Sequence, residues 1–516
     1  MTFFSFFYIF FWGSALVALV LFLILGICYW LTFFKEGLIY ILFCFISTMS
    51  YIACGEISQQ QFLKHASLGI SLVFFWITIL SWVFFDPFQL NFQGLMPCKF
   101  FTLHFYLGLD AISLFFVYLT TFLVPLCILF NNNNIYHSFH EYIICLFSLE
   151  ILLIILFSVL DLWLFYIFFE SILIPIFIFI GIWGSRQRKI HAAYLLFFYT
   201  LAGSLLMLFS IIIIYSHTGS TDLQLLWGME ISDIREKLIW LSFFFSFAIK
   251  IPMFPFHIWL PEAHVESPTE GSVILAGVLL KLGGYGFLRI LIPFFFEATL
   301  YFVPLIFLLA SIGIVYTSFA TLRQMDLKKI IAYSSIAHMN IAILGLFALD
   351  LISVSGSYIM FFSHGIVSGG LFFMIGILYD RYKTRVIKYY SGVVQLMPLF
   401  STFFLLLILG NISLPGTSSF VGEFLIFCGL LDKSRLAFFS AAIGAILCTI
   451  YSIWLYNRLT FGIINYYYPK KLIDLTRLEF NLMLPIVFFM LWLGIYPKPL
   501  LDSVVSSLSL LLTQIN

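Results

Sequence analysis

Four ionisable side chains stand deep inside long apolar runs of the sequence. They are Glu170 in DLWLFYIFFESILIPIFIF, Lys250 in FAIKIPMFPF, Lys281 in GVLLKLGGYG and Glu423 in LPGTSSFVGEF. A charged side chain in the middle of a membrane helix costs about 2.5–3.5 kcal/mol on insertion scales, so such residues usually face a polar interior and serve ion movement. The four residues therefore predict a site that moves ions across a membrane.

Lys250 stands beside a predicted break in its helix. Pro252 has no backbone donor, so it should leave the carbonyl of Ala248 without a helical partner. Three more prolines follow in the same stretch, Pro255, Pro261 and Pro268. A helix broken at membrane depth is tolerated only where it is buried in protein or lines a wet cavity. We therefore expect a functional break at 250–258.

A second long apolar segment has a similar arrangement, because Glu423 follows Pro415. We expect a second broken helix at 411–420. Interrupted helices in corresponding parts of two halves of a chain are the sequence signal of an inverted-repeat transporter site. The two breaks therefore predict two related halves, each with an ionisable group beside its break.

Two histidines are candidates for a proton relay among buried ionisable groups. His338 lies in SSIAHMN and His364 in FFSHGIVSGG, each within an apolar helix. Histidine exchanges protons near neutral pH, which suits it to a relay. In the alternative, His338 simply hydrogen-bonds Ser334, one turn earlier on the same face. We favour the relay.

A cluster of acids and histidines follows the first break: His257, Glu262, His264 and Glu266. These residue types can bind metals, but Pro261 interrupts the helix and no HExxH spacing is present. We interpret them as residues that line or cap the proton access of a half-channel. Glu150, in LFSLEILLI, is either an additional buried acid or a residue near the membrane interface.

The composition defines the class of protein. The chain has 516 residues, of which 63% are hydrophobic and 9% charged, against about 25% charged in an average soluble domain. No soluble fold could hide that much apolar surface, so we predict an all-α polytopic membrane protein. At about 20 residues per helix, the length allows about 14–15 transmembrane helices. The formal net charge of +1 gives no nucleic-acid footprint.

The eight cysteines are Cys28, Cys44, Cys54, Cys98, Cys127, Cys145, Cys428 and Cys448. None belongs to a CxxC pair or stands near a histidine at zinc-like spacing, and most lie in apolar runs. We interpret them as packing residues rather than ligands or disulfides. This weighs against an iron–sulfur or haem site. No GxGxxG follows a strand-like run either, so we expect no cofactor in this chain.

Apolar runs long enough to span a membrane stand near 8–31, 37–54, 67–86, 106–130, 141–160, 162–182, 192–216, 238–258, 270–293, 301–322, 328–348, 354–378, 396–430, 437–460 and 480–500. Short loops rich in Lys and Arg stay on the side of synthesis. Basic loops at 186–189, 323–329, 381–388 and 458–477 are separated by even numbers of spans, so they should share one face, the matrix or a bacterial cytoplasm. The polar stretch 461–479 could begin an amphipathic surface helix.

Four strings are long enough to compare with known families: KIPMFPFHIWLPEAHVESPTEGSVILAGVLLKLGGYGFLRI, DLKKIIAYSSIAHMN, FFSHGIVSGGLFFMIGILYDR and LPGTSSFVGEF. They resemble the chain 4 family among the antiporter-like membrane subunits of proton-pumping NADH:ubiquinone oxidoreductase (respiratory complex I), over roughly residues 105–500. The resemblance implies two inverted five-helix repeats. We divide the chain into N-terminal membrane helices (1–104), an antiporter-like proton-translocating core (105–460), and a C-terminal surface segment with the last transmembrane helix (461–516).

The resemblance also implies roles for the candidate residues. Glu170 and Lys250 match a proton-handling couple, for which the alternative is a satisfied structural ion pair. Lys281 matches a central lysine that passes protons between the halves, and both relay histidines match family histidines. Glu423 matches a terminal carboxylate. The larger sister subunit carries a lysine there, so the glutamate favours chain 4.

The resemblance implies a proton-translocating membrane-arm subunit that couples electron transfer from NADH to ubiquinone to proton pumping. NADH, FMN, iron–sulfur clusters and ubiquinone would be handled by other subunits. The partners would be membrane lipids and other membrane-arm subunits, including two sister antiporter-like chains. The 66 phenylalanines favour an organelle-encoded protein of the mitochondrial inner membrane, with a bacterial plasma membrane as the alternative. A stand-alone cation/proton antiporter component and a structural spacer remain rival functions.

Overall fold

The computed structural model describes residues 60–89, 92–100, 103–130, 139–228, 231–463 and 473–513. The apolar runs expected at 8–31 and 37–54 lie outside these residues. Among the described residues, 11 helices are long and apolar enough to cross a membrane, and two further spans each consist of two shorter helices. Each run expected between 67 and 500 is found as a helix or a broken helix, so the polytopic helical class is confirmed.

The first described elements are α3 (Gln60–Val83), β1 (Gln93–Phe100), β2 (Leu103–Leu109) and α4 (Ala111–Phe130). The two strands form an antiparallel hairpin that the sequence does not predict. In the sequence, β2 merges with the apolar run of α4, so the helix begins at Ala111 and not at 106. The expected boundary between 104 and 105 falls inside β2.

Five spans follow, and they are α5 (Phe139–Ser158), the pair α6 (Leu162–Ser171) and α7 (Leu173–Trp183), α8 (Lys189–Thr218), the broken pair α10 (Asp233–Lys250) and α11 (Trp259–Glu266), and a span built of α12 (Thr269–Ile274), η2 (Leu275–Leu279), α13 (Leu280–Gly286), η3 (Phe287–Leu291) and α14 (Ile292–Phe294). The short helix α9 (Leu223–Leu226) precedes α10. The fourth span is broken between Lys250 and Trp259, as expected. In the fifth, η2 and η3 are π-helical turns.

A second run of five spans has the same plan, and it comprises α15 (Phe296–Arg323), α16 (Leu327–Phe347), α17 (Leu351–Tyr382), the broken pair α19 (Pro398–Asn411) and α20 (Ser418–Lys433), and α21 (Arg435–Thr460). The short helices η4 (Ile387–Tyr389) and α18 (Val393–Leu396) precede α19. The fourth span is again broken, between Asn411 and Ser418, as expected. Because five is an odd number of crossings, the second run enters the membrane from the opposite side and is inverted relative to the first.

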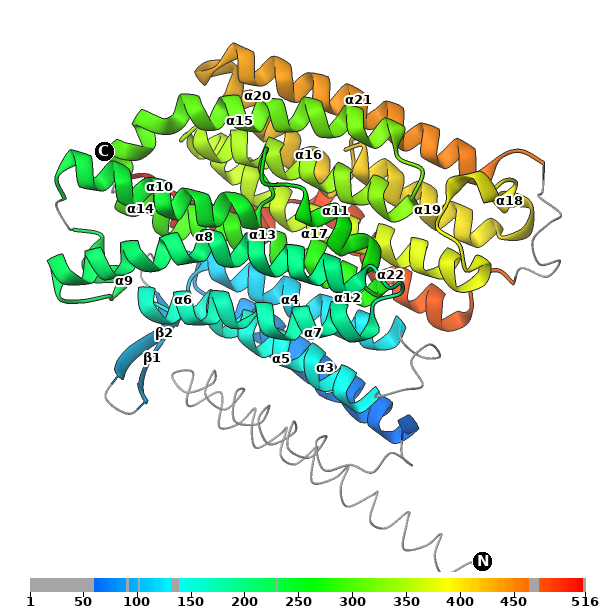
Figure 1. Cartoon of the computed structure of the whole chain (residues 1–516), viewed down its shortest axis with the longest axis horizontal. Helices are drawn as coiled ribbons and strands as arrows, with labels where there is room; N and C mark the ends of the chain where they lie inside the picture. Colours follow the sequence, from blue (N-terminus) through cyan, green and yellow to red (C-terminus); the bar gives the residue numbers. More distant parts are fainter. Residues whose placement is uncertain are drawn as a thin grey trace, which may run out of the picture.

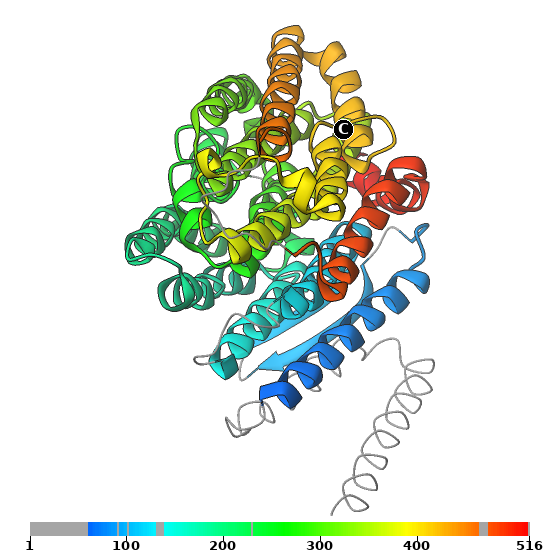
Figure 2. The ribbon, with the colours of Figure 1, turned by 90° about the vertical axis from the view of Figure 1, so that its right-hand side faces the viewer.

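The spans pack into one elongated bundle and run across the page in Figure 1. The hairpin, α9 and α14 lie at one end of the spans, and α12 and α18 lie at the other (Figure 1). Figure 2 looks along the spans and places α3 (blue) and α21 (orange) at opposite edges of the bundle. Helices are the expected local structure, because hydrocarbon offers no partner for backbone polar groups and a helix satisfies its own.

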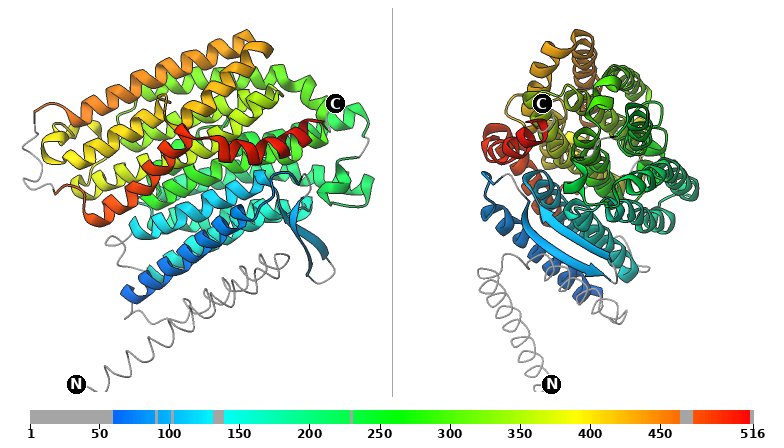
Figure 3. Two further views of the ribbon diagram at one scale, coloured as in Figure 1. Left: turned by 180° about the vertical axis from the view of Figure 1, so that it is seen from behind. Right: turned by 90° about the vertical axis from the view of Figure 1, so that its left-hand side faces the viewer.

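Two helices close the described chain, α22 (Arg477–Ile495) and α23 (Lys498–Thr513). Figure 3 shows α23 (red) continuing from α22 at an angle along the bundle. The sequence predicts one transmembrane helix here, near 480–500, and α22 with the start of α23 occupies it. Most of α23 is therefore additional, and it packs on α4 and α17. Residues 464–472 of the predicted surface segment lie outside the described residues.

The basic loops meet on one face of the bundle, which confirms that part of the orientation argument. The Arg385 guanidinium donates to the Ser185 hydroxyl at 2.5 Å, and its carbonyl accepts from Leu327 N at 3.0 Å. Gly392 N donates to the Phe461 carbonyl at 3.2 Å. We call this the basic face, and the end that carries β1 and β2 the hairpin face.

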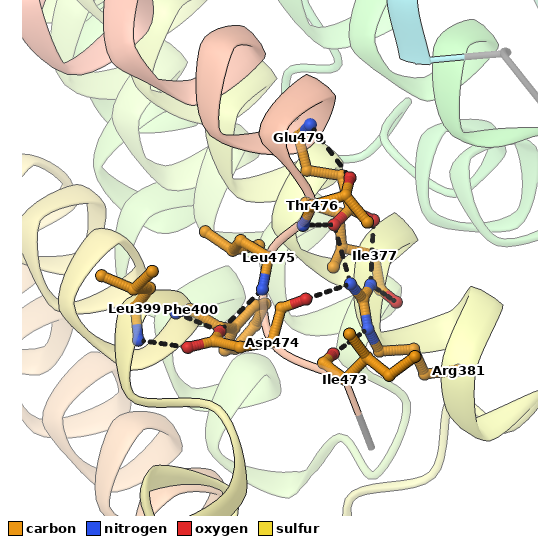
Figure 4. A network of polar contacts seen from close by, with 9 residues as sticks. All are labelled: Ile377, Arg381, Leu399, Phe400, Ile473, Asp474, Leu475, Thr476 and Glu479. Atoms are coloured by element: carbon orange, nitrogen blue, oxygen red, sulfur yellow. Dashed lines mark hydrogen bonds and ion pairs between the residues drawn. The ribbon is translucent and has the colours of Figure 1, made fainter. Parts of the chain in front are cut away.

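A polar clasp on the basic face joins three helices (Figure 4). Arg381, in the last turn of α17, grips both carboxylate oxygens of Glu479 on α22, at 2.9 and 2.7 Å. The same guanidinium donates to the carbonyls of Ile473 and Asp474. The Asp474 carboxylate accepts from Leu399 N at 2.8 Å and so caps α19. The clasp therefore fixes the ends of α17, α19 and α22 relative to one another.

Candidate functional site

Lys250 is the last residue of α10 and is 3% exposed. The break beside it is not a set of free backbone groups. The Ala248 carbonyl accepts from Met253 N at 2.9 Å, and the Ile249 carbonyl accepts from the Trp259 indole at 2.9 Å. As expected, Pro252 gives the Ala248 carbonyl no helical partner, but the carbonyl is not left free, because the chain turns back and the amide of Met253 bonds it.

Glu170 lies near the end of α6 and is half-buried beside Lys250. The Lys250 ammonium sits 4.4 Å from the ring centroid of Phe169, the residue before Glu170. In the described part of the chain, Glu170 and Lys250 form no ion pair within 4.0 Å, and one Glu170 carboxylate oxygen is buried without a hydrogen-bond partner. The satisfied ion pair of the alternative interpretation is therefore not present.

Lys281 is fully buried, directly after the π-helical turn η2. Its ammonium donates to the carbonyl of Ala276 in that turn and contacts His364 Nδ1 at 2.9 Å. A π-bulge inside a helix often marks a functional position. Here the turn supplies a carbonyl to the lysine, and α17 supplies the histidine.

Glycines after Lys281 allow close helix contacts, as expected. A Cβ on Gly283 would stand 2.7 Å from the carbonyl oxygen of Phe247 on α10, and it would also meet Ile251. Phe247 and Ile251 flank Lys250 in the sequence. Helix α13 therefore packs directly against the end of α10, and the two lysines belong to adjoining elements.

The two histidines continue the polar chain from Lys281. The rings of His364 and His338 have centroids 5.9 Å apart. His338 Nδ1 lies 3.3 Å from a carboxylate oxygen of Glu423. Ser334 instead donates to the Ile331 carbonyl at 2.8 Å, so it does not bond His338. Lys281, His364, His338 and Glu423 thus follow one another through the second half of the bundle.

Glu423 lies on α20 just beyond the second break and is 5% exposed. Three residues contribute polar atoms nearby that were not singled out as functional from the sequence. The Cys448 thiol lies 3.5 Å from His338 Nε2, accepts from the Tyr451 hydroxyl at 3.0 Å and contacts the Asn411 carbonyl at 3.4 Å. Cys448 is therefore part of the polar chain, and its interpretation as a packing residue is wrong. Its spacing to Tyr451, one helical turn, is the one signal that pairs them.

The cluster after the first break does not converge on one point. His257 stacks on Phe254 and meets the Tyr316 ring edge-on, and His264 is stacked on Phe372 with ring centroids 4.8 Å apart. Glu262 pairs with Lys329 at 2.8 Å near the surface. Within the described ranges, no group of three or more His, Cys, Asp or Glu side chains could hold a metal ion.

Several buried charges lie between this cluster and the basic face. Glu266, Glu270 and Lys328 are all buried, and the Lys328 ammonium donates to the Ser267 carbonyl at 2.8 Å. Arg385, in the loop after α17, donates to the Val265 carbonyl, and burial lowers the pKa of its guanidinium. Of these, only Glu266 was singled out from the sequence.

Glu150 is an additional buried acid on α5 and not an interface residue. It is 0% exposed, and neither carboxylate oxygen has a hydrogen-bond partner among the residues that the structure describes. At the hairpin face, a second unpredicted pair is buried, because Arg289 Nη2 lies 2.6 Å from Asp110. Arg289 also donates to the Tyr285 hydroxyl at 3.3 Å.

Comparison with known proteins agrees with this arrangement. The family described as NADH:quinone oxidoreductase/Mrp antiporter, TM, matches residues 159–449. NADH-ubiquinone oxidoreductase chain 4 of Chondrus crispus is 50% identical over 458 residues, which cover 88% of this chain and 93% of the relative. The chain of the same name from Marchantia polymorpha is 51% identical over 455 residues, covering 88% and 92%.

Solved structures show the same architecture. A chain of respiratory complex I from Thermus thermophilus with bound NADH superimposes with a TM-score of 0.81 at 26% identity, covering 88% of this chain and 95% of that chain. A chain of the Mrp complex from Dietzia sp. DQ12-45-1b also gives 0.81, at 16% identity, covering 94% of this chain and 99% of that chain, and shares the fold alone. From its close relatives and the matched family, the chain belongs to the family of NADH-ubiquinone oxidoreductase chain 4.

Proposed function

We propose that six residues form the proton path of this chain, and they are Glu170, Lys250, Lys281, His364, His338 and Glu423. As a member of the chain 4 family, the chain is a proton-pumping membrane-arm subunit of H+-translocating NADH:ubiquinone oxidoreductase, and a multi-pass protein of the mitochondrial inner membrane. The observation that carries the residue assignment is the continuous series of contacts from Lys281 through His364 and His338 to Glu423.

In the first half, Glu170 controls the charge of Lys250. An ammonium in apolar surroundings gives up its proton more readily when its counter-charge moves away. The open arrangement of the two groups, with the ammonium over the Phe169 ring, supports a pair that makes and breaks contact during turnover. Lys250 then passes its proton across the α10–α13 contact to Lys281.

In the second half, Lys281 donates through its ammonium to His364, which is already 2.9 Å away. The proton continues to His338 and from Nδ1 to Glu423, at 3.3 Å. Each of these groups can both accept and release a proton. Each is also buried, so the proton is not lost to bulk water on the way. A change in hydration and pairing at Glu170 and Lys250 would set the direction of transfer.

The chain assembles with other complex I subunits. We infer that its neighbours in the membrane arm include the two sister antiporter-like chains. We also infer that NADH, FMN, iron–sulfur clusters and ubiquinone are handled by other subunits. Redox energy would then reach this chain through its neighbours.

The test is NADH-driven proton pumping in membrane vesicles that contain the assembled complex with Lys250→Ala. We expect a complex of normal size in which pumping and coupled NADH oxidation collapse. Lys237→Ala is the matched control, because Lys237 lies on the same helix at the hairpin face, over the Tyr301 ring, and it should pump like the unmodified complex.

If the Lys250→Ala complex assembles and pumps at the full rate, the proton path proposed here is wrong and the buried charges are structural. The shared fold with the Mrp complex suggests a second measurement on the same vesicles. Proton flux driven by a cation gradient without NADH would indicate a stand-alone antiporter activity, and we expect none.

A further inference from the structure

The Cys448 thiol occupies the side of His338 that faces away from Glu423. Its sulfur lies 3.5 Å from His338 Nε2, while Nδ1 of the same ring lies 3.3 Å from Glu423. On its other sides the sulfur accepts from the Tyr451 hydroxyl at 3.0 Å and lies 3.4 Å from the Asn411 carbonyl oxygen. The imidazole therefore has a hydrogen-bonding contact at Nε2 and an ion-pair distance at Nδ1.

The Asn411 carbonyl is available to the thiol because α19 ends at this residue. The chain turns through Ser413, whose φ is 62°, before α20 begins. No following helical turn therefore takes this carbonyl. The thiol can donate either to this oxygen or to His338 Nε2, and it needs only a rotation of its S–H bond to change between them.

The position of the S–H bond follows the protonation of Nε2 on His338. A neutral imidazole has one donor and one acceptor nitrogen, whereas the imidazolium has two donors. A neutral ring with its only proton on Nδ1 would accept at Nε2 from the thiol. When Nε2 carries a proton, as it does in the imidazolium, Nε2–H donates to the sulfur and the thiol donates to Asn411 instead.

This arrangement determines which proton the imidazolium releases. Nε2–H is held by the sulfur, whose own proton bonds Asn411, so the Nδ1 proton is the one that leaves. It passes to the Glu423 carboxylate, and His338 becomes neutral with its remaining proton on Nε2. No proton is left on or taken from the sulfur, so the thiol stays a thiol throughout.

We propose that Cys448 is a positioning residue for the terminal proton transfer, whose thiol holds His338 Nε2 and directs the proton on Nδ1 to Glu423. The proposal rests on the proton path proposed above. It assigns a functional contact to α21, which contributes none of the six path residues.

The titratable groups around His338 come from four elements and bear on any pH profile. Glu423 faces it from α20, His364 from α17 and Tyr451 from α21, while Lys281 on α13 lies one residue further along the chain of contacts. None of these changes in a Cys448 variant. A shift in the profile can therefore be assigned to the missing thiol.

The experiment compares Cys448→Ala with Cys448→Ser in the assembled complex, by NADH-driven pumping in vesicles as a function of pH. We expect Cys448→Ala to lower pumping by about tenfold, as for outer-shell partners that orient a functional histidine. The alkaline limb of its profile should move to lower pH, because the imidazolium has lost an acceptor. Cys448→Ser keeps a donor and acceptor hydroxyl and should restore both rate and profile. Cys428→Ala, on α20, is the matched control and should change neither.

Three results decide the proposal. A Cys448→Ala complex with unchanged rate and pH profile overturns it, as does a loss of rate that the serine variant fails to restore. The S–H stretching band gives a further readout in the unmodified complex, because the thiol should donate to Asn411 both before and after the transfer; a band that differs between resting and NADH-driven states contradicts this bonding. If Lys281→Met and Glu423→Gln also pump normally, the proposed proton path is wrong. If these two variants lose pumping while Cys448→Ala pumps normally, the path stands and only the role of Cys448 is wrong.

Discussion

Gly422 of α20 lies against Gly356 of α17 so closely that a Cβ on Gly422 would stand 3.1 Å from the Gly356 carbonyl oxygen. The contact is reciprocal, since a Cβ on Gly356 would stand 2.9 Å from the Gly422 carbonyl oxygen. Backbone therefore meets backbone one residue before Glu423. This contact sets how far Glu423 reaches towards His338.

Gly422→Ala should push α20 away from α17. Backbone atoms cannot move aside like the end of a flexible side chain, so we expect destabilisation of about 1–3 kcal/mol, as for other overpacked cores. The purified complex should show a lower thermal midpoint, and its proton pumping should fall because the distance from His338 to Glu423 increases.

Gly181→Ala on α7 is the matched control for this substitution. No heavy atom lies within 4 Å of a Cβ built there, and alanine is favoured over glycine in a helix by about 0.8–1 kcal/mol. We expect an unchanged or slightly raised thermal midpoint with normal pumping. Equal behaviour of the two variants would contradict the close-contact argument.

Glu423→Gln should separate packing from proton transfer. The amide keeps the shape of the carboxyl group and can still bond His338, but it cannot take up the charge of the transfer. We expect normal assembly with pumping almost abolished, measured as NADH-driven acidification in vesicles. Glu297→Gln, at an exposed position at the start of α15, should leave pumping intact, and a similar loss there would point to a general effect of removing acids.

Most of the buried charged residues of the site can be identified from the sequence, because the free-energy cost of an ion in hydrocarbon depends on the residues immediately around it. A lysine such as Lys250 stands out wherever an apolar run surrounds it, and a proline beside it locates the break. Which groups meet is a different matter. Lys281 and His364 are separated by 83 residues, and no spacing rule pairs residues so distant. The family resemblance, and not the pattern, suggested that both belong to one path.

The misses have physical reasons as well. Cys448 lies in an apolar run, where a thiol looks like any small packing residue, and its partner His338 is 110 residues away. The strand β2 reads as the beginning of α4 because both are apolar. The proline rule considers only the helical partner of the Ala248 carbonyl, which Pro252 cannot supply. It does not predict the hydrogen bond from the amide of Met253, which forms because the chain turns after the helix.

Arg381→Lys should loosen the basic face. Lysine cannot reproduce the two parallel bonds to Glu479 or reach the carbonyls of Ile473 and Asp474 at the same time. Hydrogen bonds to charged groups contribute about 1.5–3 kcal/mol each, and both partners here are mostly buried, so we expect a lowered thermal midpoint of the complex and faster proteolysis of the loop before α22. Arg458→Lys, at an exposed position of α21, should change neither measurement.

Arg289 and Asp110 should behave as one energetic unit at the hairpin face. The guanidinium is 2% exposed and the carboxylate 12%, so removal of either partner leaves a buried charge without compensation. Such single losses cost about 3–5 kcal/mol. Arg289→Met alone and Asp110→Asn alone should therefore each lower the thermal midpoint strongly.

The double variant Arg289→Met with Asp110→Asn should recover much of that loss, because it buries no unpaired charge. The measurement is the coupling energy obtained from the thermal midpoints of the unmodified complex, the two single variants and the double variant, and we expect it to be large and favourable. Additive losses would show that the pair does not interact and that each residue acts through its own helix, Asp110 by capping α4 through Ser113 N at 3.0 Å. Pumping in the double variant should stay near normal, because neither residue belongs to the proposed proton path.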